Sequence, residues 1–139
     1  MTQVTARDLQ VTKLASGVAT ILFVNDQTYA MSVRADYLRT RGHVVLVADS
    51  AASALETLLN NPVDATVLDC HMLGAGEIAD MLKRLRPQLP LVILASYCAR
   101  PCPVLGTVEV CVAKAESPAT LLETLQAVLV GETGEQEVA

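Results

Sequence analysis

Five polar residues stand at the ends of short apolar runs in this sequence. Asn25 and Asp26 follow the first run, Asp69 follows the third, Ser96 the fourth and Lys114 the fifth. Carboxylate and amide oxygens suit Mg²⁺, which binds few carboxylates and keeps several waters. An aspartate beside a metal, a hydroxyl and an ammonium group could accept a phosphoryl group, because the cations neutralise the added charge. Such chemistry requires that the five residues meet in the folded chain.

The apolar runs have the length and composition of buried strands. They are residues 18–24, 44–48, 65–68, 91–95 and 108–113. The first four are continuously apolar apart from a threonine, which is typical of parallel strands that helices cover on both faces. Glu109 interrupts the fifth run, so we expect that strand nearer an edge of the sheet.

Helical patterns separate most of these runs. Apolar residues recur at helical spacing in the segments 27–41, 50–60, 76–86 and 117–130. Asp49 or Ser50 could cap the second helix, and Ser117 followed by Pro118 starts the last. Between the fourth and fifth runs, residues 97–107 contain two prolines and a glycine, so we expect the helix there to be short or missing. The alternation predicts βαβ units and a parallel sheet.

The carboxyl ends of parallel strands meet at one edge of the sheet, where open α/β sheets bind ligands. The five polar residues are therefore expected at this edge. Two carboxylates repel each other unless a cation lies between Asp26 and Asp69, so Mg²⁺ fits there. Lys114 could pair with a carboxylate or with an incoming anion. The residues by themselves predict an aspartate that accepts a phosphoryl group.

Composition fits one aliphatic-rich domain. The chain has 139 residues, of which 52 % are hydrophobic, 18 % charged and 3 % aromatic, with a net charge of −5. We expect an N-terminal extension (1–17), a domain (18–130) and an acidic, flexible tail (131–139). Negative charge and few aromatic rings argue against nucleic acid as a direct partner. No run can span a membrane and no signal peptide is recognisable, so we expect a cytoplasmic protein without a membrane partner.

Several segments together resemble the receiver domain of bacterial two-component response regulators. They are ILFVND (21–26), VLDCHMLGAG (67–76), LVILAS (91–96) and VCVAK (110–114), and the resemblance covers about residues 19–130. It implies a flavodoxin-like α/β fold, a three-layer α/β/α sandwich around a doubly wound, five-stranded parallel sheet.

The resemblance also implies roles for individual residues. Asp69 resembles the phosphoacceptor. Asp26 and Asp69 would bind Mg²⁺ together with the main-chain carbonyl of His71. Ser96 and Lys114 would bind the phosphoryl group.

The chain departs from the family pattern at several positions. Asn25 replaces an acid, which should weaken Mg²⁺ binding, although its amide could still orient a metal-bound water. Leu73 replaces a proline after Met72. Ala115 replaces the proline after the lysine, so the family's cis bond is not expected. Cys111 stands where the family often has an aromatic switch residue. The pocket is thus mostly retained, whereas the family's signalling face is rebuilt.

The resemblance implies a phosphorelay signalling module and not an enzyme. A histidine kinase or phosphotransfer protein would phosphorylate Asp69 with Mg²⁺ bound, and a conformational shift would pass the signal to a downstream protein. We expect no DNA-binding or enzymatic output domain beside the receiver, and a homodimer is compatible with this function. The alternative is a pseudo-receiver that binds proteins without phosphorylation, which Asn25, Ala115 and the broken helix favour.

The cysteines and His43 are the other residues capable of chemistry. Cys70, Cys98, Cys102 and Cys111 are expected to be reduced thiols. A remote alternative is a cysteine-based redox or metal-binding protein built on Cys98 and Cys102, although cysteine is also a common small buried residue. His43 is predicted to be an ordinary loop residue.

Overall fold

The computed structural model describes residues 18–96 and 110–130. Within these ranges, strands and helices alternate in the order β1 (Thr20–Val24), α2 (Thr28–Thr40), β2 (Val44–Ala48), α3 (Ala51–Asn60), β3 (Ala65–Asp69), α4 (Ala75–Leu85), β4 (Leu91–Ala95), β5 (Val110–Ala113) and α5 (Pro118–Leu129). The expected short or missing helix between β4 and β5, the extension 1–17 and the tail 131–139 lie outside the described residues.

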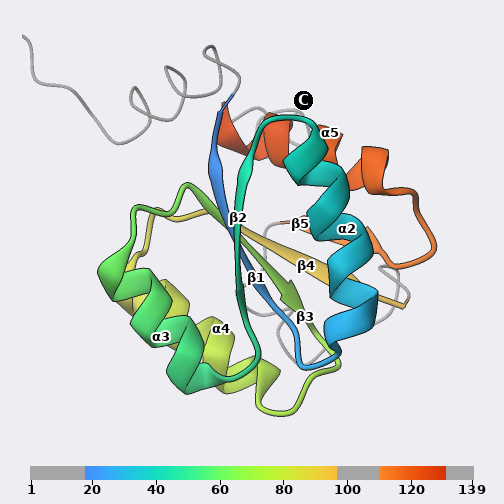
Figure 1. Ribbon diagram of the computed structural model, residues 1–139. Helices are drawn as coiled ribbons and strands as arrows, with labels where there is room; N and C mark the ends of the chain where they lie inside the picture. Colours follow the sequence, from blue (N-terminus) through green and yellow to red (C-terminus); the bar gives the residue numbers. More distant parts are fainter. Residues whose placement is uncertain (1–17, 97–109, 131–139) are drawn as a thin grey trace, which may run out of the picture.

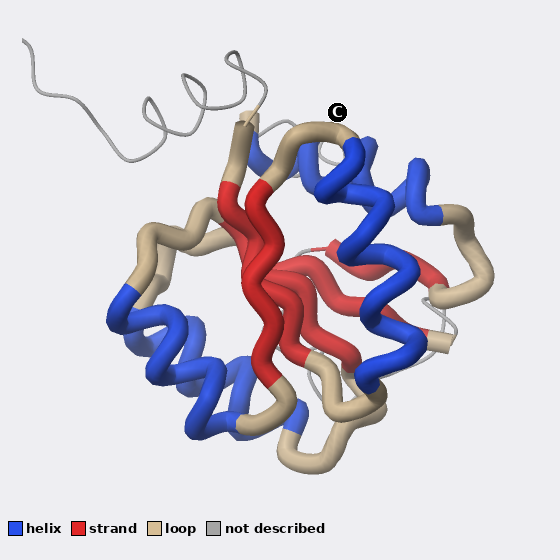
Figure 2. The backbone as a smooth tube through the Cα atoms, in the orientation of Figure 1, coloured by secondary structure: helices blue, strands red, loops and turns tan. Residues whose placement is uncertain are grey.

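All five strands of the described sheet are parallel, in the order β2-β1-β3-β4-β5. Helices α3 and α4 cover one face, and α2 and α5 cover the other (Figure 1). Figure 2 shows the twisted sheet between these two helical layers. The predicted three-layer α/β/α sandwich with a doubly wound, five-stranded parallel sheet is confirmed.

Successive strand residues point to opposite faces of the sheet, so the chain builds two cores. Leu22 and Leu68 belong to the core beneath α3 and α4. Their neighbours Phe23 and Val67 belong to the core beneath α2 and α5. Because both faces are covered, strands β1, β3 and β4 are apolar along almost their whole length.

Two helix starts follow from local capping. The Ser50 hydroxyl accepts a hydrogen bond from the Ser53 N–H, and the Ser53 hydroxyl accepts one from the Ser50 N–H, forming a capping box at α3. The Ser117 hydroxyl likewise accepts from the Thr120 N–H at α5, with Pro118 in the first turn. Ser50, Ser117 and Pro118 therefore act as the sequence predicts.

Strand β2 is less buried than its sequence predicts. Its apolar run predicted burial on both faces, but β2 is an edge strand in which Val44 and Val47 are 45 % and 47 % exposed. The Arg39 guanidinium donates to the Val45 carbonyl at 2.9 Å, which occupies one main-chain acceptor of this strand. Strand β5 lies at the opposite edge, as Glu109 predicted.

Two apolar residues in the predicted helical segments 27–41 and 50–60 are also exposed. Val33 is 54 % exposed and Leu59 is 58 % exposed, so the buried stripes of α2 and α3 are narrower than their sequence patterns. In the described part of the chain, no helix has the length and apolar character needed to cross a membrane.

Candidate phosphoryl-binding site

Strand register aligns the residues that follow the carboxyl ends of the strands. The aligned pairs are Val24 with Leu68, Asp69 with Leu94, and Ala95 with Ala113. Asn25 therefore follows next to Asp69, and Ser96 follows next to Lys114. The predicted convergence at one sheet edge is thus built by the parallel pairing itself.

Asp69 is a buried carboxylate with a partner for each oxygen. Its side chain is only 4 % exposed, and Oδ2 lies 2.7 Å from the Lys114 Nζ. Its Oδ1 accepts a hydrogen bond from the His71 N–H at 2.8 Å. The ion pair and the main-chain donor together offset the cost of removing a negative charge from water. The structure thus brings Asp69 and Lys114 into direct contact.

Lys114 is held by its main chain as well as by its ammonium group. Its N–H donates to the Ala95 carbonyl at 2.7 Å, and its own carbonyl accepts from Arg34 Nη2, also at 2.7 Å. The side chain remains 30 % exposed, so the ammonium can be reached from solvent. The contact with Arg34 was not predicted, because a single arginine on a helix 80 residues away carries no local signal of it.

The two residues after β1 differ in their surroundings. Asn25 is buried, and its side-chain Oδ1 accepts from the Gln27 N–H at 2.8 Å, which closes a tight turn. Asp26 is exposed to solvent at the same sheet edge. The amide oxygen of Asn25 is therefore engaged by the main chain, whereas the Asp26 carboxylate is available to a ligand.

A magnesium ion fits this donor set only as a weakly held, largely hydrated ion. In residues 18–96 and 110–130, no group of three or more His, Cys, Asp or Glu side chains is placed to hold a metal. Mg²⁺ commonly uses one or two carboxylates and keeps its remaining ligands as water. Asp26 and Asp69 could supply those carboxylates, but Lys114 competes for one oxygen of Asp69.

Ser96 and His71 meet at the rim of the site. The Ser96 N–H donates to the His71 Nε2 at 3.4 Å, so the imidazole links the loop after β3 to the end of β4. The loop after β3 borders a hollow of about 610 Å³ that includes Cys70, His71 and Met72. Leu73 on this loop is 91 % exposed. The side-chain contact of His71 was not predicted.

No family model matches the sequence, and no curated protein matches it. Solved structures do match. A CheY-like receiver domain from Methanospirillum hungatei JF-1 is 21 % identical, with a TM-score of 0.72 over 85 % of this chain and 98 % of that chain. CheY4 of Vibrio cholerae is 21 % identical, with a TM-score of 0.71 over 80 % and 98 %. The chain has the receiver-domain fold.

A third matching structure was solved as a complex with Mg²⁺. The response regulator TrrA from Thermotoga maritima, solved in complex with Mg²⁺-BeF, is 20 % identical, with a TM-score of 0.70 over 79 % of this chain and 98 % of that chain. At such identities the likeness establishes the receiver fold. The roles of Asp26, Asn25, Asp69, Ser96 and Lys114 remain predictions from the residues and their geometry.

One of the cysteines is not in the predicted state. Cys111 in β5 is disulfide-bonded and is therefore not the reduced thiol that the sequence predicted. Cys70 is buried and is not part of a disulfide, and Cys98 and Cys102 lie outside the described residues. The peptide bond after Lys114 is not cis, as the alanine at position 115 predicted.

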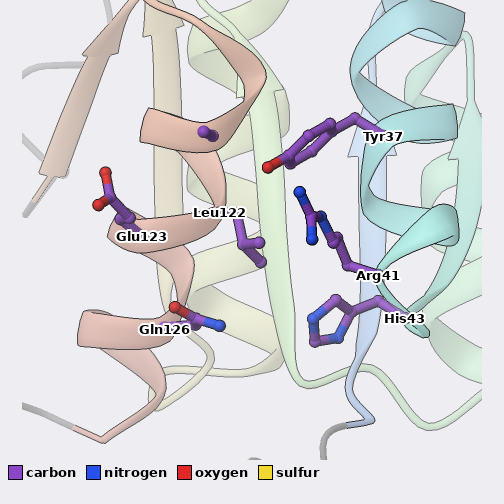
Figure 3. Close-up of a pocket in the computed structure, with 7 residues that line it drawn as sticks. Tyr37, Arg41, His43, Leu122, Glu123 and Gln126 are labelled. Carbon is purple, nitrogen blue, oxygen red and sulfur yellow. The ribbon is translucent and has the colours of Figure 1, made fainter.

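A second groove lies between α2 and α5, away from the candidate site (Figure 3). Its volume is about 480 Å³, and the Arg41 guanidinium lies 5.1 Å from the centre of the Tyr37 ring. His43 lines this groove, is 9 % exposed and accepts a hydrogen bond from the Ala19 N–H at Nδ1 (3.2 Å). Burial lowers the pKa of His43 below its ordinary value of 6.5. His43 therefore lies in a loop, as predicted, but it is buried and accepts a hydrogen bond from the residue before β1.

Proposed function

We propose that this chain is a phosphoacceptor receiver that a histidine kinase or phosphotransfer protein phosphorylates on Asp69 with Mg²⁺ present. The observation that carries the proposal is the Asp69–Lys114 ion pair at the carboxyl edge of the sheet. A buried carboxylate at the end of a strand, with a lysine that solvent can reach, offers a nucleophile and a cation at the same point. No other described carboxylate has this combination.

The proposed transfer is a simple displacement at phosphorus. One carboxylate oxygen of Asp69 attacks the phosphorus of a phosphohistidine, a P–O bond forms, and the P–N bond breaks. The departing imidazole nitrogen keeps the bonding electron pair, and the product is an acyl phosphate on Asp69. When bound at Asp26 and Asp69, Mg²⁺ would neutralise charge on the phosphoryl oxygens.

Phosphorylation would change the partners of the residues around Asp69. The ammonium of Lys114 now pairs with Asp69 Oδ2 and would pair with a phosphoryl oxygen after transfer. Ser96 supplies a hydroxyl at the neighbouring strand end. Movement of the Ser96 segment would also alter its hydrogen bond to His71. These local changes would bias two conformations that a downstream protein distinguishes.

The protein would act in the cytoplasm as a phosphorelay component and not as an enzyme. Its downstream partner would be a protein, and a homodimer is one form that the signalling state could take.

A phosphorylation-independent pseudo-receiver is the second candidate. Two observations favour it: Lys114 pairs directly with Asp69, and Asn25, where an acid would strengthen metal binding, is engaged in a main-chain turn. In this function the ion pair would be a permanent structural element, and the same fold would bind its partner in a single state.

Incubation with acetyl phosphate and Mg²⁺, followed by intact-mass spectrometry, separates the two candidates. We expect one added phosphoryl group on the wild type and none on Asp69→Asn. Asp36→Asn, which changes an exposed aspartate on α2, is the matched control and should retain the adduct. Beryllium fluoride with Mg²⁺ should shift the NMR signals of residues around Asp69. A wild type that gains neither adduct nor NMR shift is a pseudo-receiver.

A further inference from the structure

We infer that Arg34 is a positioning residue that fixes the main chain of Lys114 and thereby directs its ammonium group to Asp69. Arg34 lies at the middle of α2, and its Nη2 donates to the Lys114 carbonyl at 2.7 Å in a partly buried position. The two residues are 80 positions apart in the sequence. This inference rests on the proposed function and assigns a role within the same site.

Lys114 needs such an anchor because of its place in the sheet. It follows β5, a strand of four residues at the edge of the sheet, with β4 as its neighbour on one side only. On that side, the Lys114 N–H donates to the Ala95 carbonyl at 2.7 Å. The Lys114 carbonyl finds its partner in Arg34, on a helix that covers one face of the sheet.

The residue after Lys114 does not stiffen the chain. Ala115 lies in a turn that the Glu116 N–H closes by donating to the Ala113 carbonyl at 3.0 Å. An alanine leaves both main-chain dihedrals free, whereas the arginine bond holds the carbonyl plane from outside the turn. The planar guanidinium is suited to this task because its donors have a fixed geometry.

Position matters here because the lysine side chain is long and flexible. Holding a four-carbon chain in one geometry costs rotamer entropy, and a mobile Cα would add to that cost. Misplacing a group by about 1 Å can lower a reaction rate by about 100-fold. The main chain of Lys114 is fixed on two sides, which lowers the entropy cost of holding its Nζ 2.7 Å from Asp69 Oδ2.

Arg39 provides a matched control on the same helix. Its guanidinium also donates to a partly buried main-chain carbonyl, that of Val45, at 2.9 Å. That bond lies at the β2 edge of the sheet, opposite the β5 edge where Arg34 acts. Arg39→Met should therefore lower the free energy of unfolding about as much as Arg34→Met, without disturbing Lys114.

The first measurement is the rate of phosphorylation by acetyl phosphate. We expect Arg34→Met to slow it by about tenfold or more, Arg34→Lys to recover part of the loss, and Arg39→Met to leave the rate unchanged. In a Lys114→Met background, Arg34→Met should have no further effect, because the arginine acts through the lysine. An equal slowing by Arg34→Met in both backgrounds would overturn the inference.

The second measurement does not depend on phosphorylation. The NMR signals of the Lys114 ammonium and its neighbouring methylene report the ion pair with Asp69, and Lys114→Met assigns them. We expect these signals to move toward those of a free lysine in Arg34→Met and to stay unchanged in Arg39→Met. Unchanged signals in a folded Arg34→Met overturn the positioning role. If the wild type takes no phosphoryl group but the signals move, the proposed function fails and the positioning role stands.

Discussion

Two buried aspartates bracket strand β3, and they are held in different ways. Asp64 precedes the strand, and its Oδ2 accepts from the Thr20 N–H at 2.7 Å, while its own N–H donates to the Thr20 carbonyl at 2.8 Å. Asp69 ends the strand, and its Oδ2 pairs with the Lys114 ammonium at 2.7 Å. Both are almost fully buried, at 6 % and 3 % exposed.

The same contrast extends to the two ends of the parallel strands, the amino edge and the carboxyl edge of the sheet. At the amino edge, Asp64 and His43 accept hydrogen bonds from the N–H groups of Thr20 and Ala19, which begin β1 or directly precede it. At the carboxyl edge, Asp69 Oδ1 accepts from the His71 N–H in the loop after β3, but its Oδ2 pairs with a flexible lysine that is 30 % exposed. A main-chain donor cannot leave its acceptor without unfolding the strand, whereas a lysine can change partners. Buried charge thus stabilises the fold at one edge and is available for chemistry at the other.

The largest effect that tests this contrast concerns stability. Asp64→Ala should lower the free energy of unfolding by about 1–3 kcal/mol, because the partly buried Thr20 N–H loses its acceptor. Asp69→Ala should cost less than Asp64→Ala, because the Lys114 ammonium and the N–H of the exposed His71 can both turn to water. Urea unfolding of both variants measures the difference. Equal losses, or a larger loss for Asp69→Ala, would remove the distinction between the two edges.

A smaller effect concerns metal binding at the carboxyl edge. Asn25→Asp adds a carboxylate beside Asp69, so the metal-free protein should become less stable while Mg²⁺ binds about tenfold more tightly, equivalent to about 1.4 kcal/mol. Isothermal titration calorimetry with MgCl₂ gives the affinity, and thermal unfolding with and without Mg²⁺ gives the stability. Asn60→Asp, at the exposed end of α3, is the control and should leave Mg²⁺ affinity unchanged. Unaltered affinity in Asn25→Asp would mean that no metal binds at this edge.

The smallest effect is a pH dependence at the amino edge. Burial lowers the pKa of His43 in the folded protein below 6.5, so the unfolded chain binds a proton first as the pH falls. The contribution of His43 to stability is therefore present above about pH 6.5 and is lost as the pH falls toward the lowered pKa. Urea unfolding between pH 7.5 and 5.5 should show a shallower loss for His43→Gln than for the wild type. Parallel curves would show that His43 is as well solvated in the folded chain as in the unfolded one.

Much of the architecture could be predicted because it follows from local composition. Runs of β-branched and aliphatic residues predicted the strands, and helical spacing predicted the helices to within one or two residues in the described segments. Ser50 and Ser117 marked helix starts by capping, which involves residues three positions apart. The site residues Asp69 and Lys114 could be proposed together because parallel strands end at a common edge.

Other features could not be read from local patterns. The exposure of Val44 and Val47 depends on which strand lies at the edge of the sheet. An apolar run has the same composition in an edge strand as in a central one. The disulfide of Cys111 likewise depends on proximity in the fold.

By itself, the sequence determined the class of fold and the chemical groups that gather at one edge of the sheet. Local propensity and the period of the apolar pattern are properties of neighbouring residues, so they are present before the chain folds. Only the tertiary structure decided which buried polar groups meet. The partners of His43, Asp64 and Arg34 lie 24, 44 and 80 residues away along the chain. Such contacts exist only when the strand order and the helix packing bring those segments side by side.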